Sequence, residues 1–319
     1  MNRPASTPIV DLLDHWGPGH RPDLGLEESR AYCRDLTLRH GENFSVLSRF
    51  VPKRMHEGMS AVYAFCRWAD DLGDEVGDSD RSTELLQWWR AELASCFEGQ
   101  PRHPVFTALA PVIERHGLDI DPFERLIGAF EADQTVTRYD TWDGVLGYCR
   151  GSADPVGRLV LKLADEPCTP DQLTSSDSIC TALQLTNHWQ DVKRDLLERD
   201  RIYLPADMHS IAEFERRLRS TATIGHAPDV EFLSEYRALL RDCVERTWPL
   251  FEQGRSLLEL VSPDIRPILW LFQAGGVTIL RRITQWNYET CLDRPRISRF
   301  TKLLLVLQAR RASMKGAAA

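Results

Sequence analysis

Acidic residues gather at two widely separated places in this 319-residue chain. The run CRWADDLGDEVGD contains Asp70, Asp71, Asp74 and Glu75, and the run LQLTNHWQDVKRD contains Asp191 and Asp195. In each run carboxylates recur four residues apart inside a partly apolar segment of helical spacing, so each set projects from one face of a helix. Carboxylates that face an apolar interior need cations and an anionic ligand to be stable there. The two runs therefore predict a site for a magnesium-bridged diphosphate.

Each acidic run is part of a longer polar stripe. The first stripe consists of Tyr63, Arg67, Asp70 and Asp74, at spacings of four, three and four residues. The second consists of Gln184, Asn187, Asp191 and Asp195, at spacings of three, four and four residues. An Asn followed by two Asp at these intervals presents three oxygen donors along one edge, which hard cations prefer. One such stripe would be typical of a solvated helix face, whereas two in one chain favour a functional site.

Spacing and composition exclude several other kinds of site. An EF-hand loop that started at Asp70 or Asp74 would need Asp or Asn two residues later, where the chain has Leu72 or Val76. No nucleotide-binding glycine motif, hydrolase elbow or zinc-protease motif is present, and His188 is expected to be a packing or hydrogen-bonding residue. A net charge of −8, with no concentrated basic segment, excludes nucleic acid as a partner. The 8 scattered cysteines indicate a reducing cytosol and no structural zinc.

Helical periodicity dominates the chain, and no segment has the alternation of a convincing strand. Helices are predicted at 27–39, 54–71, 83–97, 104–116, 122–135, 142–150, 156–164, 174–197, 229–260, 263–291 and 298–312. The breaks are short and carry Gly, Pro or a capping Asp, apart from the weakly patterned segment 205–228. We expect no signal peptide, because the N-terminus has no continuous apolar core and is broken early by Pro and charged residues. We expect no membrane span, because the longest apolar stretch, 268–280, is shorter than about 20 residues. The pattern predicts one all-α domain over residues 1–319, with 1–25 and 312–319 poorly ordered.

The two stripes resemble the two aspartate-rich motifs of the squalene and phytoene synthase family. YAFCRWADDLGDE resembles the first motif, and LQLTNHWQDVKRDLLERDRIYLP resembles the second. The resemblance extends from about His40 to Pro205, and more loosely through the helices to Cys291. Members of this family have the class I isoprenoid synthase fold, so the resemblance implies a helical bundle around a central cavity.

The resemblance also implies roles for individual residues. The ligands of two or three Mg²⁺ ions would be Asp70 and Asp74 on one wall of the cavity and Asn187, Asp191 and Asp195 on the other. The contacts to the substrate diphosphate or its chain would come from Tyr63, Arg67, Gln184, Lys193, Arg201 and Tyr203. Phe44 matches an aromatic residue at the cavity wall, although a plain core role is an equal alternative. The candidate catalytic residues are Tyr63, Asp70, Asp74, Asp191 and Asp195.

Within the family, three segments resemble the hydroxysqualene synthases of bacterial hopanoid biosynthesis more than phytoene or dehydrosqualene synthases. These segments are HGENFSVLSRFVP, YCRGSADPVGRLVL and NHWQDV. Many carotenoid-type members have Arg immediately before the Asp of the second motif, where this chain has Gln190. The resemblance therefore implies conversion of presqualene diphosphate and water to hydroxysqualene and diphosphate. Magnesium-assisted ionisation would form a carbocation that water captures, without NADPH.

Two alternative functions stay open at this point. One is head-to-head condensation of prenyl diphosphates to presqualene diphosphate, dehydrosqualene or phytoene. The other is a non-catalytic assembly protein that retains the fold. Such a protein is expected to lose acids from the metal-binding stripes, and both stripes are intact here.

The segment RFTKLLLVLQARR is apolar in its centre and basic at both ends. It is too short to span a bilayer, so it either packs on the helical bundle or lies on a membrane surface. We expect a cytoplasmic protein whose partner is its prenyl or presqualene diphosphate substrate. Peripheral contact with the inner face of the membrane and association with other enzymes of the pathway stay open.

Overall fold

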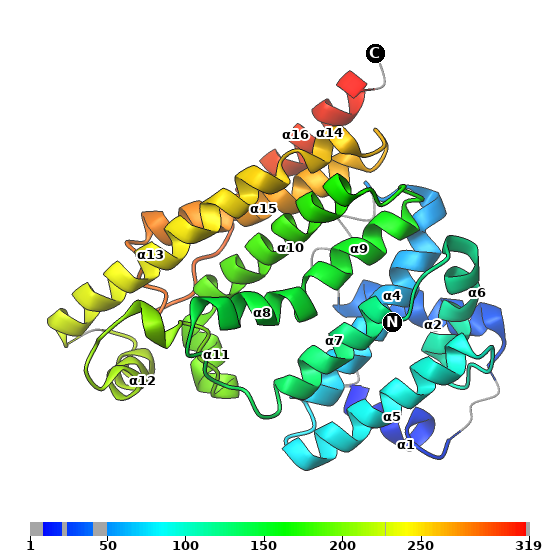
Figure 1. Cartoon of the computed structure of the whole chain (residues 1–319), viewed down its shortest axis with the longest axis horizontal. Helices are drawn as coiled ribbons and strands as arrows, with labels where there is room; N and C mark the ends of the chain where they lie inside the picture. The colour runs from blue at the N-terminus through cyan, green and yellow to red at the C-terminus, as the bar shows by residue number, and fades with distance from the viewer. Residues whose placement is uncertain (1–8, 21–23, 41–49, 227, 317–319) are drawn as a thin grey trace. The chain divides into compact units, whose positions relative to one another are not determined.

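The structure is a computed structural model that describes residues 9–20, 24–40, 50–226 and 228–316 (Figure 1). These residues form two compact units. The first unit comprises the chain up to Thr135 together with Pro155–Cys168, and the second comprises Val136–Asp154 together with the chain from Thr169. In the described part of the chain the regular elements are helices, beside one isolated parallel bridge between Arg138 and Ile202. The all-α prediction is confirmed, and a single domain over 1–319 stays a prediction.

The bounds of the helices are as follows. The first unit contains η1 (Ile9–Leu12), α1 (Leu13–Trp16), α2 (Leu26–His40), η2 (Lys53–Met55), α4 (His56–Asp74), α5 (Ser79–Phe97), α6 (Pro104–His116), α7 (Asp121–Ala132) and most of α9 (Asp154–Leu163). The second unit contains α8 (Trp142–Ser152), α10 (Pro170–Gln190), α11 (Val192–Arg199), η3 (Ala206–Met208), α12 (Phe214–Ile224), α13 (Val230–Gly254), α14 (Leu257–Leu260), α15 (Arg266–Gln285) and α16 (Arg299–Gly316).

Most predicted helices are confirmed to within a few residues, but four predictions were wrong in detail. The helix predicted at 174–197 is interrupted at Asp191, and the one predicted at 229–260 ends at Gly254 before the separate helix α14. The helix predicted at 263–291 ends at Gln285, because Asn287 and Tyr288 have positive φ angles that a helix does not accommodate. The segment 205–228 contains α12, whose many charged residues hide its apolar periodicity. No described helix combines the length and the hydropathy needed to cross a membrane.

The core of the first unit is an aromatic cluster between α4, α5 and α6. Phe65 and Trp68 of α4 are fully buried, and Trp68 stacks on Trp89 of α5 with ring centroids 5.3 Å apart. His103 is enclosed by this cluster, with its ring centroid 4.4 Å from that of Trp68. Its Nδ1 accepts the backbone N–H of Val105 at 3.1 Å and so caps the start of α6. Stacked and edge-to-face rings stabilise this packing, which holds α4 in place.

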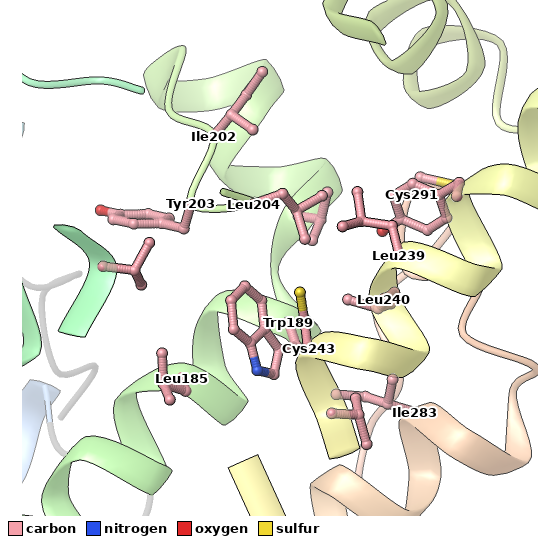
Figure 2. Packing of buried hydrophobic residues seen from close by; sticks show 14 of the residues in the cluster. Leu185, Trp189, Ile202, Tyr203, Leu204, Leu239, Leu240, Cys243, Ile283 and Cys291 are labelled. Carbon is pink, nitrogen blue, oxygen red and sulfur yellow. The ribbon is translucent and has the colours of Figure 1, made fainter. Parts of the chain in front are cut away.

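The core of the second unit lies where α10 packs against α13 and α15, which run alongside one another in Figure 1. Trp189 lies at its centre among side chains from α13 and α15, as Figure 2 shows, and its Nε1 donates to Thr247 Oγ1 at 2.9 Å. Gly254 of α13 allows the close approach to α10, because a Cβ there would collide with Ile179 and would lie 3.0 Å from the carbonyl oxygen of Ser175. This packing orients α10, which carries most of the second stripe.

Candidate active site

The first stripe lies along one edge of α4. Its opposite side is apolar and fully buried at Phe65, Trp68 and Leu72, which recur at helical spacing. The stripe itself is half-exposed along its length at Tyr63, Arg67, Asp70 and Asp74. The four side chains therefore share one edge of α4, as their spacing predicts.

Arg67 links the charged groups of this edge. Its Nη1 lies 3.3 Å from Asp70 Oδ2, while its Nη2 forms an ion pair with Asp71. The Nε atom of Arg67 is buried and has no hydrogen-bond partner among the described residues. A buried donor without an acceptor is unfavourable, so this atom is suited to an anionic ligand. Burial also raises the pKa of the neighbouring Tyr63 hydroxyl, which keeps it a neutral hydrogen-bond donor.

Asp71 has a different role from its neighbour Asp70. Its side chain is 2% exposed, and it lies on the buried side of α4, near the backbone N–H of Ile9, which donates to it. Burial raises the pKa of the Asp71 carboxyl to about 6, against the opposing effect of Arg67. Asp71 therefore anchors Arg67 and the chain at Ile9, and the helical repeat already separates it from the stripe of Asp70 and Asp74.

The second stripe crosses the break between α10 and α11. Asp191 has φ −103° and ψ 13°, which ends α10, yet its N–H donates to Asn187 O at 2.9 Å and its carbonyl accepts the N–H of Asp195 at 2.8 Å. Because these bonds continue the spacing of four residues across the break, the stripe keeps its register. Gln184 is half-buried, Asn187 is exposed, and the two carboxylates are buried.

Two arginines neutralise the buried carboxylate of Asp191, whose side chain is 0% exposed. Arg194 Nη2 lies 2.7 Å from its Oδ2, and Arg294 donates to both carboxylate oxygens from Nε and Nη2, the latter at 3.2 Å. Burial raises the pKa of the nearby Asp195 carboxyl to about 6, with Arg194 opposing this shift. Neither arginine was predicted from the sequence as part of the site. Arg194 could have been found from its spacing of three residues from Asp191, whereas Arg294 has no local signal.

Two further side chains hold the segment 292–295 against the second motif. Gln190 Nε2 donates to Pro295 O at 2.6 Å, and Lys193 Nζ donates to Leu292 O at 2.8 Å. Together with Arg294 on Asp191, these contacts connect α10 and α11 to the chain after α15. The Lys193 ammonium is thus directed at a backbone carbonyl, and its contact with substrate stays a prediction.

The loop after α11 returns over α10. Arg201 and Tyr203 are both buried, and the N–H of Arg201 donates to Asp195 O at 3.0 Å. Tyr203 stacks on His188 with ring centroids 3.6 Å apart (Figure 2 shows Tyr203 on this loop). Burial lowers the pKa of His188 to about 3, so its ring is neutral. The prediction that His188 is a packing residue is confirmed.

The donor set of the two motifs fits magnesium, because carboxylate and amide oxygens are its preferred protein ligands. Among the residues that the structure describes, no three His, Cys, Asp or Glu side chains gather closely enough to hold a metal ion by themselves. Magnesium is commonly bound by one or two carboxylates together with substrate phosphates, so the diphosphate would complete the coordination. The metal-binding and substrate-binding assignments stay predictions, and Phe44 lies outside the described residues.

Comparison with known proteins gives consistent matches. A model of the squalene/phytoene synthase family matches residues 37–301. Hydroxysqualene synthase from Rhodopseudomonas palustris is 41% identical over 56% of this chain and 60% of its own length, and that from Zymomonas mobilis is 37% identical over 52% and 56%. Phytoene synthase from Arthrospira platensis is 27% identical over 90% of this chain and 94% of its own length. The chain thus matches little more than half the length of these two hydroxysqualene synthases.

Solved structures match over more of the chain than the two hydroxysqualene synthases do. The crystal structure of squalene synthase HpnC from Alicyclobacillus acidocaldarius has a TM-score of 0.72 and 39% identity, covering 82% of this chain and 95% of that one. A dehydrosqualene synthase in complex with ligand has a TM-score of 0.76 and 24% identity, covering 91% and 98%, which shows the fold alone. Squalene synthases have the class I isoprenoid synthase fold, so the predicted fold class is confirmed.

Proposed function

This chain belongs to the squalene/phytoene synthase family, and we propose that within this family it acts as a hydroxysqualene synthase. Family membership makes it an enzyme of isoprenoid biosynthesis that uses prenyl diphosphates, and it implies magnesium-dependent diphosphate chemistry. The proposed reaction converts presqualene diphosphate and water to hydroxysqualene, diphosphate and a proton. It supplies a compound for hopanoid biosynthesis and needs no nicotinamide.

The observation that carries the choice within the family is the side chain at position 190. Gln190 is neutral and buried, and its amide donates to the carbonyl of Pro295. This position therefore contributes no cation to a ligand, in contrast to the Arg that many carotenoid-type members have there. Head-to-head condensation begins from two diphosphates, whereas presqualene diphosphate carries only one. With Gln190 in place of that Arg, the second motif carries one positive charge fewer than it would in those members, which favours the substrate with one diphosphate.

The residues of the two stripes would perform the first half of the reaction. Asp70 and Asp74 of the first stripe would hold magnesium, and so would the oxygen donors of the second stripe; magnesium would neutralise the diphosphate as it leaves. Arg67, anchored by Asp71, would donate its buried Nε to a diphosphate oxygen, because this atom otherwise has no acceptor. The bond between carbon and the diphosphate oxygen then breaks, and its electron pair leaves with the diphosphate.

The second half of the reaction requires a dry cavity and one positioned water. The cyclopropylcarbinyl cation rearranges, and its cyclopropane ring opens. The water oxygen then forms the new C–O bond, and its proton is released. The neutral hydroxyl of Tyr63 is a suitable donor near the departing diphosphate, because burial raises its pKa. Aromatic faces can stabilise a cation without reacting with it.

Product analysis tests this proposal. We expect purified protein with Mg²⁺ and presqualene diphosphate, without reductant, to form hydroxysqualene detected by mass spectrometry. In ¹⁸O-labelled water the product should carry the label, because the new C–O bond comes from water. Formation of only presqualene diphosphate, dehydrosqualene or phytoene from prenyl diphosphates would move the assignment to the head-to-head synthases. Formation of squalene only when NADPH is added would also contradict it.

Variants of the stripes test the residue assignments. Asp70→Asn and Asp195→Asn should each lower turnover at least about a hundredfold, because a lost metal ligand weakens magnesium and diphosphate binding. The control is Asp80→Asn, an exposed residue at the start of α5 that should leave turnover unchanged. Circular dichroism checks that each variant is folded. Full turnover in the Asp70 and Asp195 variants would refute the assigned roles.

A further inference from the structure

Helix α16 presents an apolar stripe to solvent on the side away from its packing partner. The helix packs on α15, and Ala309 on its inner side is fully buried. The exposed fractions on the other side are 69% for Phe300, 53% for Leu303, 42% for Leu304 and 44% for Leu307. Their spacing of three, one and three residues places them on one face. No other helix in the described part of the chain exposes more than two large apolar side chains.

The stripe is embedded in a strongly basic stretch of an acidic protein. The basic residues between positions 294 and 316 are Arg294, Arg296, Arg299, Lys302, Arg310, Arg311 and Lys315, and this stretch has no Asp or Glu. The whole chain has a net charge of −8. Arg294 is used by Asp191, but Arg296 and Arg299 are exposed. In the sequence, Arg310 and Arg311 follow Leu307 by three and four residues.

These observations identify the partner by its chemistry. A second copy of this helix would bring like charges together on both sides of the stripe, which is unfavourable. A bilayer with anionic headgroups satisfies both features at once, since the acyl boundary covers Phe and Leu while the headgroups pair with Arg and Lys. At 18 residues, with basic residues near both of its ends, α16 is not long and apolar enough to cross the bilayer.

We propose that α16 docks this protein on anionic lipid bilayers by burying the stripe of Phe300, Leu303, Leu304 and Leu307. This proposal does not rest on the substrate assigned above, and its test uses no substrate. Binding combines burial of the stripe with attraction between Lys or Arg and the headgroups, so it should be strong on anionic vesicles, weak on neutral ones, and reduced by added salt.

Vesicle flotation tests the proposal directly. Full-length protein is mixed with vesicles of phosphatidylcholine and phosphatidylglycerol, or with vesicles of phosphatidylcholine alone. The double variant Leu303→Glu with Leu307→Glu should reduce partitioning to the anionic vesicles by about tenfold or more, because two exposed side chains that enter the bilayer on docking become charged. Arg310→Gln with Arg311→Gln should reduce it on anionic vesicles while leaving the stripe intact.

The matched control changes two exposed apolar residues elsewhere in the same unit. Val230→Glu with Leu260→Glu adds the same charge to α13 and α14 and should leave partitioning unchanged. Equal losses in the control and in the Leu303 variant would overturn the proposal, since net charge alone would explain them. Failure of the parent protein to bind anionic vesicles would also overturn it. A dimer that the Leu303 variant alone dissociates, measured by light scattering, would assign the stripe to a second copy instead.

Discussion

The pairing of Arg294 with Asp191 makes a quantitative prediction about the protein without magnesium. Asp191 is fully buried, and Arg294 binds both of its oxygens, whereas Arg194 contacts one. Replacing Arg294 by Gln removes the charge and the bidentate contact. The carboxylate then depends on Arg194 alone.

The expected loss of unfolding free energy follows from these contacts. Removing one partner of a buried ion pair costs about 3–5 kcal/mol when the remaining charge has no other partner. Here Arg194 remains, and the Arg294 side chain is 35% exposed, so solvent screens part of its interaction. A hydrogen bond to a charged group contributes about 1.5–3 kcal/mol, and the lower part of this range applies. We therefore expect Arg294→Gln to lower the unfolding free energy by about 2 kcal/mol.

A double-mutant cycle, measured by urea unfolding in EDTA, separates the interaction energy of Arg294 with Asp191 from the effect that each substitution has by itself. The cycle compares the parent, Arg294→Gln, Asp191→Asn and the double variant, with exposed Arg296→Gln as the control. Contacting residues have coupling energies of about 0.5–3 kcal/mol, and we expect about 1–2 kcal/mol here. Magnesium with pyrophosphate should reduce the loss in Arg294→Gln, since a new cation compensates Asp191. A coupling below about 0.5 kcal/mol would refute the reasoning.

Three further predictions concern stability. Burial lowers the pKa of His103 from 6.5 to about 3, so between these pH values the folded state binds fewer protons than the unfolded state. The unfolding free energy should therefore fall as pH drops below 6.5, by about 1.4 kcal/mol per pH unit. His103→Asn, which keeps a capping acceptor, should flatten this dependence in urea titrations at several pH values. In α15, Gly276→Ala should destabilise the protein by about 1–3 kcal/mol, because a Cβ there would lie 2.8 Å from the Phe251 ring. Its neighbour Gly275 has nothing within 4 Å of such a Cβ, so Gly275→Ala should stabilise the protein by about 1 kcal/mol. Equal shifts of the thermal unfolding midpoint in the two variants would contradict this. Thr169→Ala should lower the unfolding free energy by about 1 kcal/mol in thermal unfolding, since it removes the capping box of α10.

Much of the candidate site was predictable, because its residues lie on helices. The repeat of 3.6 residues places Tyr63, Arg67, Asp70 and Asp74 on one edge whatever α4 packs against. The same repeat applied to Asp71 would have assigned it to the buried side, next to the apolar residues of that helix. The break at Asp191 was not predictable by periodicity, since the residues on both sides of it continue the same pattern.

The amino-acid sequence by itself determined the helical class, the two stripes and the family of this protein, because helical spacing and short motifs are local properties of the chain. Only the tertiary structure decided which charges neutralise the stripes. Arg294 meets Asp191 across 103 positions in the chain, and Lys193 and Gln190 are directed at carbonyls of the same distant segment. Such pairs form because buried charges and amides must find partners when the helices pack, and no local pattern specifies which partner comes within reach.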